Sequence, residues 1–312
     1  MSATLSLNAA AEHRVGIIGT GNMGGGMALN LLARGWHVQI HDIDHTKVAA
    51  LRARGAIVCT DAASAAANLP ITIVCVVDAL QCEAVLWGEG GVQARPGGLS
   101  GHTVMLCPTI APADVERFAA RLAQAGAATI DAPMSGGPQR AAEGTMSLMV
   151  ACADAVRASH NALLQVLSNR VFHLGERPGD GARMKLVNNL LAGINLVGAA
   201  EALAMAQRMG IDLGTVLDVI EQSSGQSWVG SDRMRRAIVD DYAPRAHATL
   251  LRKDTALAVQ AAREVGFEGP LGAAASNVFA RALERGWAHL DDAVIFRLLS
   301  EPPSARFPAD AG

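Results

Sequence analysis

One lysine interrupts an apolar helical pattern in the stretch Gly179–Gly193, GDGARMKLVNNLLAG. Lys185 and Asn189 are four residues apart, so on a helix they share one face. Burying an ammonium or an amide in apolar surroundings is unfavourable unless a polar group meets it. Lys185 is therefore either a lysine that reaches solvent beside structural asparagines, or a buried acid–base group next to an amide that holds a substrate oxygen.

A glycine-rich loop follows the first predicted strand, Arg14–Ile18. It has the pattern G-x-G-x-x-G, in which the loop residues are Gly19, Gly21, Asn22, Met23 and Gly24. A helix is predicted from 25 to 34 and a second strand from 38 to 41. Inside such a βαβ unit the glycines let the backbone approach a pyrophosphate at a helix N-terminus. The motif predicts a dinucleotide-binding domain; the alternative is a plain glycine-rich turn.

Asp42 ends the second predicted strand, 18 residues after Gly24. An acid at roughly 20 residues from the loop bonds the ribose 2′-hydroxyl of NAD and repels the 2′-phosphate of NADP. Because no arginine directly follows Asp42, we predict NAD as the cofactor. Lys47 and the nearby histidines keep NADP as the alternative.

Three further cofactor candidates lie at the carboxyl ends of predicted apolar strands, namely Val76, Val77 and Thr109. The strands over 71–77 and 103–106 are continuous apolar runs typical of a parallel sheet. Their carboxyl ends are where α/β sheets hold ligands, although ordinary turn residues occur there as well.

A Ser-Gly-Gly sequence follows the predicted strand end 129–131. Ser135, Gly136 and Gly137 offer a hydroxyl and unshielded backbone N–H groups, which suit a carboxylate. The alternative is a Gly/Pro turn between strands.

Composition limits the class of protein. The chain has 312 residues, 50% of them hydrophobic and 18% charged, with a formal net charge of −3. The slightly negative net charge and the scattered positions of Lys and Arg argue against a nucleic-acid-binding surface. Five cysteines without a C-x-x-C pair predict reduced thiols, no metal site and a cytoplasmic protein. The first residues lack the pattern of a signal peptide, and asparagines interrupt the most apolar helix, so no membrane partner is expected.

The order of elements predicts two domains. Strands and helices alternate up to residue 179, and only helices are predicted after it. We expect an α/β domain with a Rossmann-type, mostly parallel sheet over 1–179 and an all-helical substrate and oligomerisation domain over 180–300, joined by a long helix. The last residues, 301–312, are expected to be disordered.

Four stretches in order resemble the β-hydroxyacid dehydrogenase family, which includes 3-hydroxyisobutyrate dehydrogenases and tartronate semialdehyde reductases. They are GIIGTGNMGGGMALNLL, DAPMSGGPQRAAEGTMSLMV, GDGARMKLVNN and KDTALA. The resemblance implies a Rossmann domain and a helical domain with the active site between them, assembled as homodimers or homotetramers.

The resemblance also implies roles for individual residues. The cofactor loop is Gly19–Gly24, the ribose-binding acid is Asp42 and the carboxylate loop is Ser135–Gly137. Lys185 is the implied catalytic lysine and Asn189 the asparagine for the substrate hydroxyl. Lys253 is implied to lie near nicotinamide and substrate, with Asp254 as its structural neighbour. Trp228 is either a pocket residue or a core tryptophan.

The predicted activity is reversible, NAD(P)-dependent hydride transfer to and from a short 3-hydroxy acid such as 3-hydroxyisobutyrate. The alternatives are a reductase for tartronate semialdehyde, glyoxylate or succinic semialdehyde, a phosphosugar acid dehydrogenase, and a non-catalytic NAD(H) sensor. Pro108 and Ala246 depart from the family pattern of a serine and an aromatic residue, which bears on the identity of the substrate.

Overall fold

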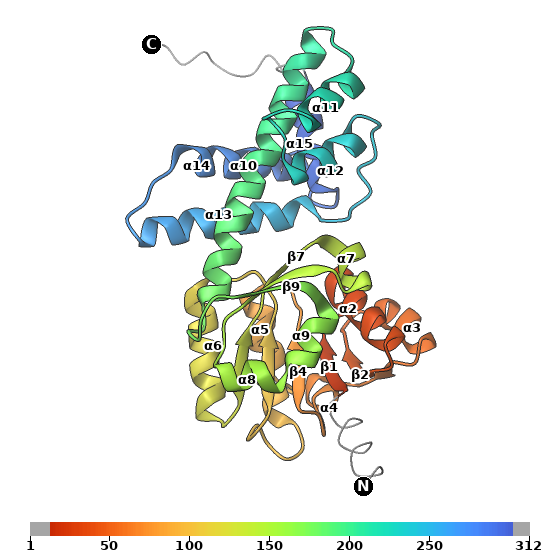
Figure 1. The fold of residues 1–312 in the computed structure, drawn as a ribbon, viewed down its shortest axis with the longest axis vertical. Coiled ribbons are helices and arrows are strands. Elements are labelled where there is room, and N and C mark those ends of the chain that lie inside the picture. Colours follow the sequence, from red (N-terminus) through yellow and green to blue (C-terminus); the bar gives the residue numbers. More distant parts are fainter. Residues whose placement is uncertain (1–12, 302–312) are drawn as a thin grey trace. The chain divides into compact units, whose positions relative to one another are not determined.

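The computed structural model describes residues 13–301 (Figure 1). The expectation of no signal peptide concerns the first residues, of which 1–12 lie outside the described residues. Residues 302–312 of the tail 301–312, which is expected to be disordered, lie outside them as well. The chain divides into two compact units, Met1–Lys185 and Leu186–Gly312.

Six parallel strands form the large sheet of the first unit, in the order β3-β2-β1-β4-β5-β6. These strands are β1 (Arg14–Ile18), β2 (His37–His41), β3 (Ile57–Val58), β4 (Ile71–Val74), β5 (Thr103–Leu106) and β6 (Ala128–Asp131). The winding direction reverses between β1 and β4, which is where sheets of this kind bind ligands at their carboxyl ends.

Helices bury both faces of this sheet because successive side chains of a strand point to opposite faces. Ile17 and Ile73 belong to one core, together with the apolar side of α2. Ile18 and Val74 belong to a second core, formed with α4, α5 and α6. The helices are α2 (Asn22–Ala33), α3 (His45–Ala53), α4 (Ala62–Ala65), α5 (Ala79–Trp87), α6 (Pro112–Gln124), α8 (Asp154–Ser159) and α9 (Asn161–Leu167).

A second, three-stranded sheet follows β6, which the sequence did not lead us to expect. It contains β7 (Met134–Ser135), β8 (Met146–Val150) and β9 (Ser168–His173), with β7 antiparallel and β9 parallel to β8. Helix α7 (Gly137–Glu143) connects β7 to β8 and packs against α2. The side chains of Met146, Leu148 and Val150 join the core around α2.

The second unit is helical throughout its described residues. Its helices are α11 (Leu213–Glu221), α12 (Trp228–Ala237), α13 (Ala248–Glu264), α14 (Pro270–Glu284) and α15 (Ile295–Ser300), packed with most of α10 (Asp180–Arg208). The predicted class, a Rossmann-type sheet followed by a helical part that begins with a long helix, is confirmed.

Helix α10 is long and apolar enough, by length and composition alone, to cross a membrane. Its Leu196, Ala200 and Leu203 side chains are fully buried among α12, α14 and α15, so the helix serves as the core helix of the second unit.

Some element boundaries differ from the predictions. The strand expected to reach Val77 ends at Val74, which leaves Val76 and Val77 in the following loop. Helix α12 starts at Trp228, because the Ser227 side chain accepts a hydrogen bond from the Gly230 N–H and begins the helix there.

His102 is buried at the amino end of β5 and connects it to the preceding strand. One ring nitrogen, Nδ1, lies 3.0 Å from the Leu69 carbonyl oxygen, which can only accept, so Nδ1 carries the proton. The other nitrogen, Nε2, lies 3.1 Å from the Thr72 hydroxyl and accepts from it. Burial and the nearby Arg95 charge lower the pKa of His102 to about 4.

The lowered pKa predicts a loss of stability in acid. His102 is neutral in the folded chain and protonates in the unfolded chain below its ordinary pKa of about 6.5, so the free energy of unfolding falls as the pH drops from 6.5 to 4. This group contributes on the order of 3 kcal/mol over that range. Urea titrations at pH 7 and pH 4.5 should show a smaller difference for His102→Gln than for the natural chain; equal differences would contradict the assignment.

Candidate functional site

The glycine loop joins β1 to α2, and two of its glycines are required by packing. A Cβ on Gly24 would lie 1.9 Å from the Gly19 carbonyl oxygen, and a Cβ on Gly19 would lie 2.5 Å from the Cys75 carbonyl oxygen. Gly19 also has a φ of +89°, which side chains other than glycine rarely adopt. These contacts hold the start of α2 close to the ends of β1 and β4.

Gly21 differs from its neighbours, because a Cβ there would meet no other described atom within 4 Å. Gly21 precedes the first turn of α2, and no side chain caps that turn. Open space beside the amide groups of a helix N-terminus suits a phosphate group. The loop therefore fits the pyrophosphate of a dinucleotide, with Asn22 and Met23 in the first turn.

Asp42 follows β2 and is bonded to the same loop. Its Oδ2 accepts hydrogen bonds from the Thr20 N–H at 2.6 Å and the Thr20 hydroxyl at 3.1 Å. Its Oδ1 accepts from the Asp44 N–H at 2.9 Å. The carboxylate is therefore fixed at the carboxyl end of β2, where it presents negative charge.

Ile43, which the sequence analysis did not single out, comes next and leaves 91% of its surface exposed. An exposed isoleucine at this point offers an apolar surface to a planar base. The sequence feature that could have indicated Ile43 is its position as an apolar residue between two acids, Asp42 and Asp44.

Val76, Val77 and Thr109 follow the carboxyl ends of β4 and β5. The Val77 N–H donates to the Gln81 side-chain oxygen at 3.0 Å, and its side chain is about half exposed. These residues share the sheet edge with the glycine loop and Asp42, since all these strands are parallel.

The Ser-Gly-Gly sequence spans the end of β7 and the start of α7. Ser135 lies in β7, paired with Ser147 of β8. Gly136 and Gly137 have φ values of +140° and +76°, so both positions favour glycine. The carbon stem of Arg140 lies against Gly136, where a Cβ would be 2.9 Å from the Arg140 Cδ.

Lys185 and Asn189 are both buried on α10, at 8% and 7% exposure, one helical turn apart. The Asn189 Nδ2 donates to the Asp254 Oδ2 at 2.7 Å, and the Lys253 Nζ donates to the Asp254 Oδ1 at 2.7 Å. A carboxylate only accepts, so this contact fixes which amide atom of Asn189 is the nitrogen. One Nδ2 hydrogen then remains for another oxygen.

Asp254 therefore orders two of the predicted site residues at once. From the sequence, Asp254 is expected only as a neighbour of Lys253, because no local pattern relates residue 254 to residue 189. Close packing supports the contact: a Cβ on Gly193, one turn after Asn189, would lie 2.6 Å from the Thr255 side chain.

Trp228 is the first residue of α12, and 52% of its surface is exposed. This exposure excludes the core-tryptophan alternative. Arg183, two residues before Lys185, forms ion pairs with Glu116 and Asp180.

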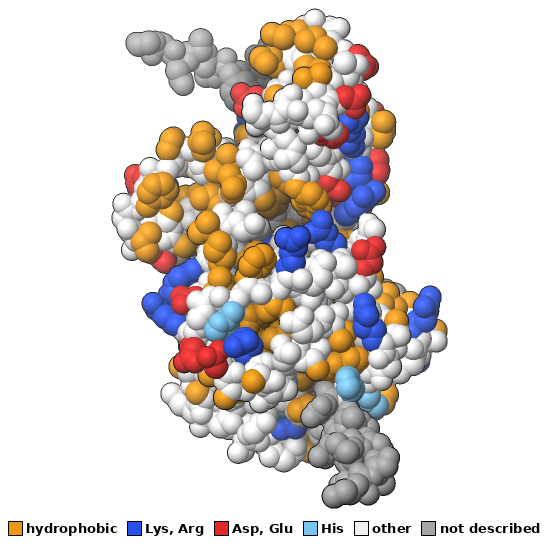
Figure 2. All heavy atoms as spheres, in the orientation of Figure 1, with side chains coloured by type: hydrophobic (Ala, Val, Ile, Leu, Met, Phe, Trp, Pro, Cys, Tyr) orange, Lys and Arg blue, Asp and Glu red, His pale blue; other side chains and the backbone are white. Residues whose placement is uncertain are grey.

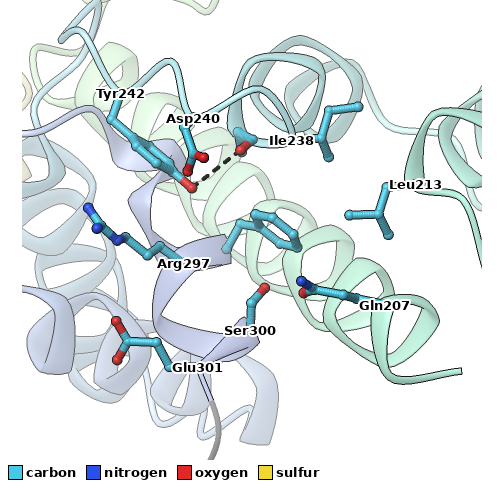
Figure 3. Close-up of a pocket in the computed structure, with 10 residues that line it drawn as sticks. Gln207, Leu213, Ile238, Asp240, Tyr242, Arg297, Ser300 and Glu301 are labelled. Atoms are coloured by element: carbon cyan, nitrogen blue, oxygen red, sulfur yellow. Dashed lines mark hydrogen bonds between the residues drawn. The ribbon is translucent and has the colours of Figure 1, made fainter. Parts of the chain in front are cut away.

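Two cavities in the second unit are lined by none of the predicted site residues. One of about 290 Å³ lies among α10, α11, α12 and α15, where the Tyr242 hydroxyl donates to the Ala237 carbonyl oxygen (Figure 3). Another, of about 590 Å³, lies among α10, α13 and α14. Within residues 13–301, no three or more His, Cys, Asp or Glu side chains are grouped to hold a metal ion.

Known proteins are similar to this chain in sequence and in fold. Residues 14–175 match the family model of the NAD binding domain of 6-phosphogluconate dehydrogenase, and residues 179–299 match NAD-binding of NADP-dependent 3-hydroxyisobutyrate dehydrogenase. L-threonate dehydrogenase of Escherichia coli is 36% identical over 293 residues, which cover 93% of this chain and 96% of that protein.

Two solved structures extend the comparison. A 3-hydroxyisobutyrate dehydrogenase from Salmonella typhimurium has a TM-score of 0.85 at 32% identity, over 91% of this chain and 99% of that one. A structure in complex with NADP⁺ has a TM-score of 0.84 at 27% identity, over 92% of this chain and 100% of that one. The resemblance predicted from the four sequence stretches is confirmed.

Two glycine variants should separate binding from folding. Gly21→Ala meets no neighbour, so the melting temperature should stay the same while the added methyl group weakens NADH binding about tenfold or more. Gly24→Ala must displace the Gly19 carbonyl, so it should destabilise the first unit by about 2 kcal/mol or more. Thermal unfolding and NADH fluorescence titration measure both effects. Unchanged NADH affinity in Gly21→Ala would contradict the assigned phosphate position.

Proposed function

The chain belongs to the β-hydroxyacid dehydrogenase family, and from this premise we propose that it catalyses reversible, nicotinamide-dependent oxidation of a short hydroxy acid. The observation that carries the proposal is the buried pair Lys185 and Asn189 on α10, with the Asn189 amide oriented by Asp254. A protein that only sensed NAD(H) has no need of a buried lysine and an oriented amide.

The first unit would hold the cofactor through the glycine loop and Asp42. Amide groups at the start of α2 would face the pyrophosphate beside Gly21, and Val76, Val77 and Thr109 would line the path toward the nicotinamide. NAD, when bound, takes or returns the hydride. We propose NAD rather than NADP because Asp42 would repel a 2′-phosphate.

Lys185 would act on the proton of the substrate hydroxyl. During oxidation it takes that proton as the carbinol carbon loses its hydride, and during reduction it returns the proton to the carbonyl oxygen. Asn189 would donate its remaining Nδ2 hydrogen to the same oxygen, since the other is engaged by Asp254. Lys253 would face the substrate and nicotinamide, and its bond to Asp254 limits its movement.

The substrate carboxylate would be bound by the Ser135 hydroxyl and the amides of Gly136 and Gly137. Both glycines lack a side chain of their own and have positive φ values, a conformation in which backbone N–H groups can bind an anion. Holding the carboxylate fixes which face of the carbinol carbon meets the cofactor. Trp228, half exposed at the start of α12, would limit the size of the substrate side chain.

Two hydroxy acids are the first substrate candidates. L-Threonate is favoured by the identity to the threonate dehydrogenase, and 3-hydroxyisobutyrate by the family model and the similar structure. Reduction of the matching aldehyde or ketone uses the same residues, so the direction of reaction is a question of kinetics. Arg183 is paired with Glu116 and Asp180, which disfavours it as a ligand for the phosphate of a phosphosugar acid.

We also propose that the protein acts in the cytoplasm as a homodimer or homotetramer. Apolar side chains gather over α13 and α14 (Figure 2), where Val265, Phe267 and Leu271 are mostly exposed. Such a patch is typical of a surface covered by another chain. The cysteines within the described part of the chain are all free, which suits a reducing compartment.

A substrate screen tests the reaction class. Purified protein with NAD or NADP should produce the reduced cofactor with L-threonate or 3-hydroxyisobutyrate, read from the NADH absorbance band, and NAD should be preferred by tenfold or more in kcat/KM, about 1.4 kcal/mol. Glycerate, L-serine and 4-hydroxybutyrate complete the panel, and glyoxylate and the semialdehydes test the reverse direction. NADH binding without turnover of any of these would refute the substrate class.

Lys185→Ala should then lower kcat by about 10² to 10⁴, because the hydroxyl proton loses its acceptor. NADH affinity should change less than threefold, since the lysine lies outside the glycine loop. Lys47→Ala is the control for kcat, because Lys47 pairs with Asp44 on the surface and has no role in the proposed proton transfer. Full turnover in Lys185→Ala would exclude Lys185 as the acid–base group.

A further inference from the structure

Asp131 ends β6 and is bonded to two other segments of the first unit. Its backbone pairs with Ala151: the Asp131 N–H donates to the Ala151 oxygen at 3.1 Å, and the Ala151 N–H donates back at 2.9 Å. Its side-chain Oδ2 accepts from the Gly179 N–H at 2.8 Å and from the Ala182 N–H at 3.2 Å. Asp131 therefore connects the end of the sheet to the start of α10.

This contact needs a glycine in the first turn of α10. A Cβ on Gly181 would lie 2.8 Å from the Asp131 Cγ, from its Oδ1 and from the Met149 carbonyl oxygen. The helix start is therefore seated directly on the carboxylate and on the end of β8, with no side chain between them.

The contact is more than an ordinary helix cap. Most N-cap side chains come from the residue that precedes the helix, whereas Asp131 is 48 residues before Gly179. Asp131 is 1% exposed, and burial raises its pKa to about 6, so the carboxylate is charged at neutral pH despite its desolvation. The amides at the positive end of the helix offset part of that desolvation.

The anchored turn lies between two groups of the proposed reaction. Lys185 follows Ala182 by three residues, and Ser135 follows Asp131 by four. We propose that Asp131, through Gly179, Gly181 and Ala182, is a positioning residue that sets where Lys185 lies relative to the Ser135 loop. The inference rests on the proposed function, since it assigns Lys185 and Ser135 to one reaction.

Three variants test this positioning role. Asp131→Ala removes the oxygen that accepts from both N–H groups, and kcat should fall about 10²-fold, as expected when a reacting group is displaced by about 1 Å. NADH affinity should stay within threefold. Asp131→Asn keeps one oxygen for the same two N–H groups, so it should restore a large part of kcat. If Asp131→Ala does not fold, Asp131→Asn and the next variant still decide.

For Gly181→Ala, the proposed contact and helix propensity predict different effects on turnover. Alanine favours a helix over glycine, so propensity alone predicts a more stable protein with unchanged turnover. If the anchor positions Lys185, Gly181→Ala should lose turnover as Asp131→Ala does. The matched control is Gly198→Ala in the same helix, where a Cβ meets no described neighbour, and there kcat should be unchanged.

Lysine labelling supplies a measurement that needs no turnover. The chain contains three lysines, Lys47, Lys185 and Lys253, so acetylation of each can be followed on its own peptide by mass spectrometry. Lys185 is 8% exposed and should react slowly in the natural protein. In Asp131→Ala and Gly181→Ala its rate relative to Lys47 should rise several-fold, while Gly198→Ala should leave it unchanged.

The outcomes separate this inference from the proposed function. A natural protein without turnover on the whole panel refutes the function, and labelling then decides the positioning of Lys185 alone. With turnover present, unchanged kcat in Asp131→Ala and Gly181→Ala overturns the inference. Equal losses of NADH affinity and kcat, without rescue by Asp131→Asn, also overturn it, because they indicate general damage to the unit.

Discussion

A polar side chain that is buried in an apolar helix needs a hydrogen-bond partner. The contacts of Asn189 on α10 follow from this constraint. The Asp254 carboxylate accepts a hydrogen bond from the Asn189 Nδ2 at 2.7 Å, and the Lys253 ammonium group forms an ion pair with Asp254. Each partner leaves the other little freedom, so the amide points in one direction before any ligand arrives. That fixed direction is what allows an asparagine to select a substrate oxygen.

Glycines set how closely the supporting elements approach. Gly24 lets α2 pass over the Gly19 carbonyl, Gly16 lets α4 approach β1, and Gly193 lets α13 approach α10. A Cβ at any of these positions would lie less than 3 Å from a neighbouring atom. The glycine loop and the Asn189–Asp254 contact therefore depend on the same device, backbone brought near backbone or side chain without an intervening methyl group.

Local sequence patterns were sufficient to predict most helices and strands and the candidate residues that lie within a single loop. The alternation of apolar strands with helices predicted the large sheet, and G-x-G-x-x-G with Asp42 located its carboxyl edge. The short strand β7 has two residues and no periodicity, so the second sheet escaped prediction. The bonds of Asp254 to Asn189 and of Asp131 to Ala182 join residues 65 and 51 apart, and no local pattern encodes such a distance.

Lysine and arginine occur at different kinds of position in this chain, according to whether the side chain must lose a proton. The chain has 26 Lys and Arg residues, of which 3 are lysines and 23 are arginines. Arginine forms most of the surface ion pairs and the buried pairs with Asp291 and Asp292, where a permanent charge and a planar donor set are useful. Arginine does not release its proton at physiological pH, so it cannot exchange one with a hydroxyl group. Two of the three lysines, Lys185 and Lys253, are the ones placed with Asn189 and Asp254 on α10 and α13, where the proposed reaction needs a group that can gain and lose a proton.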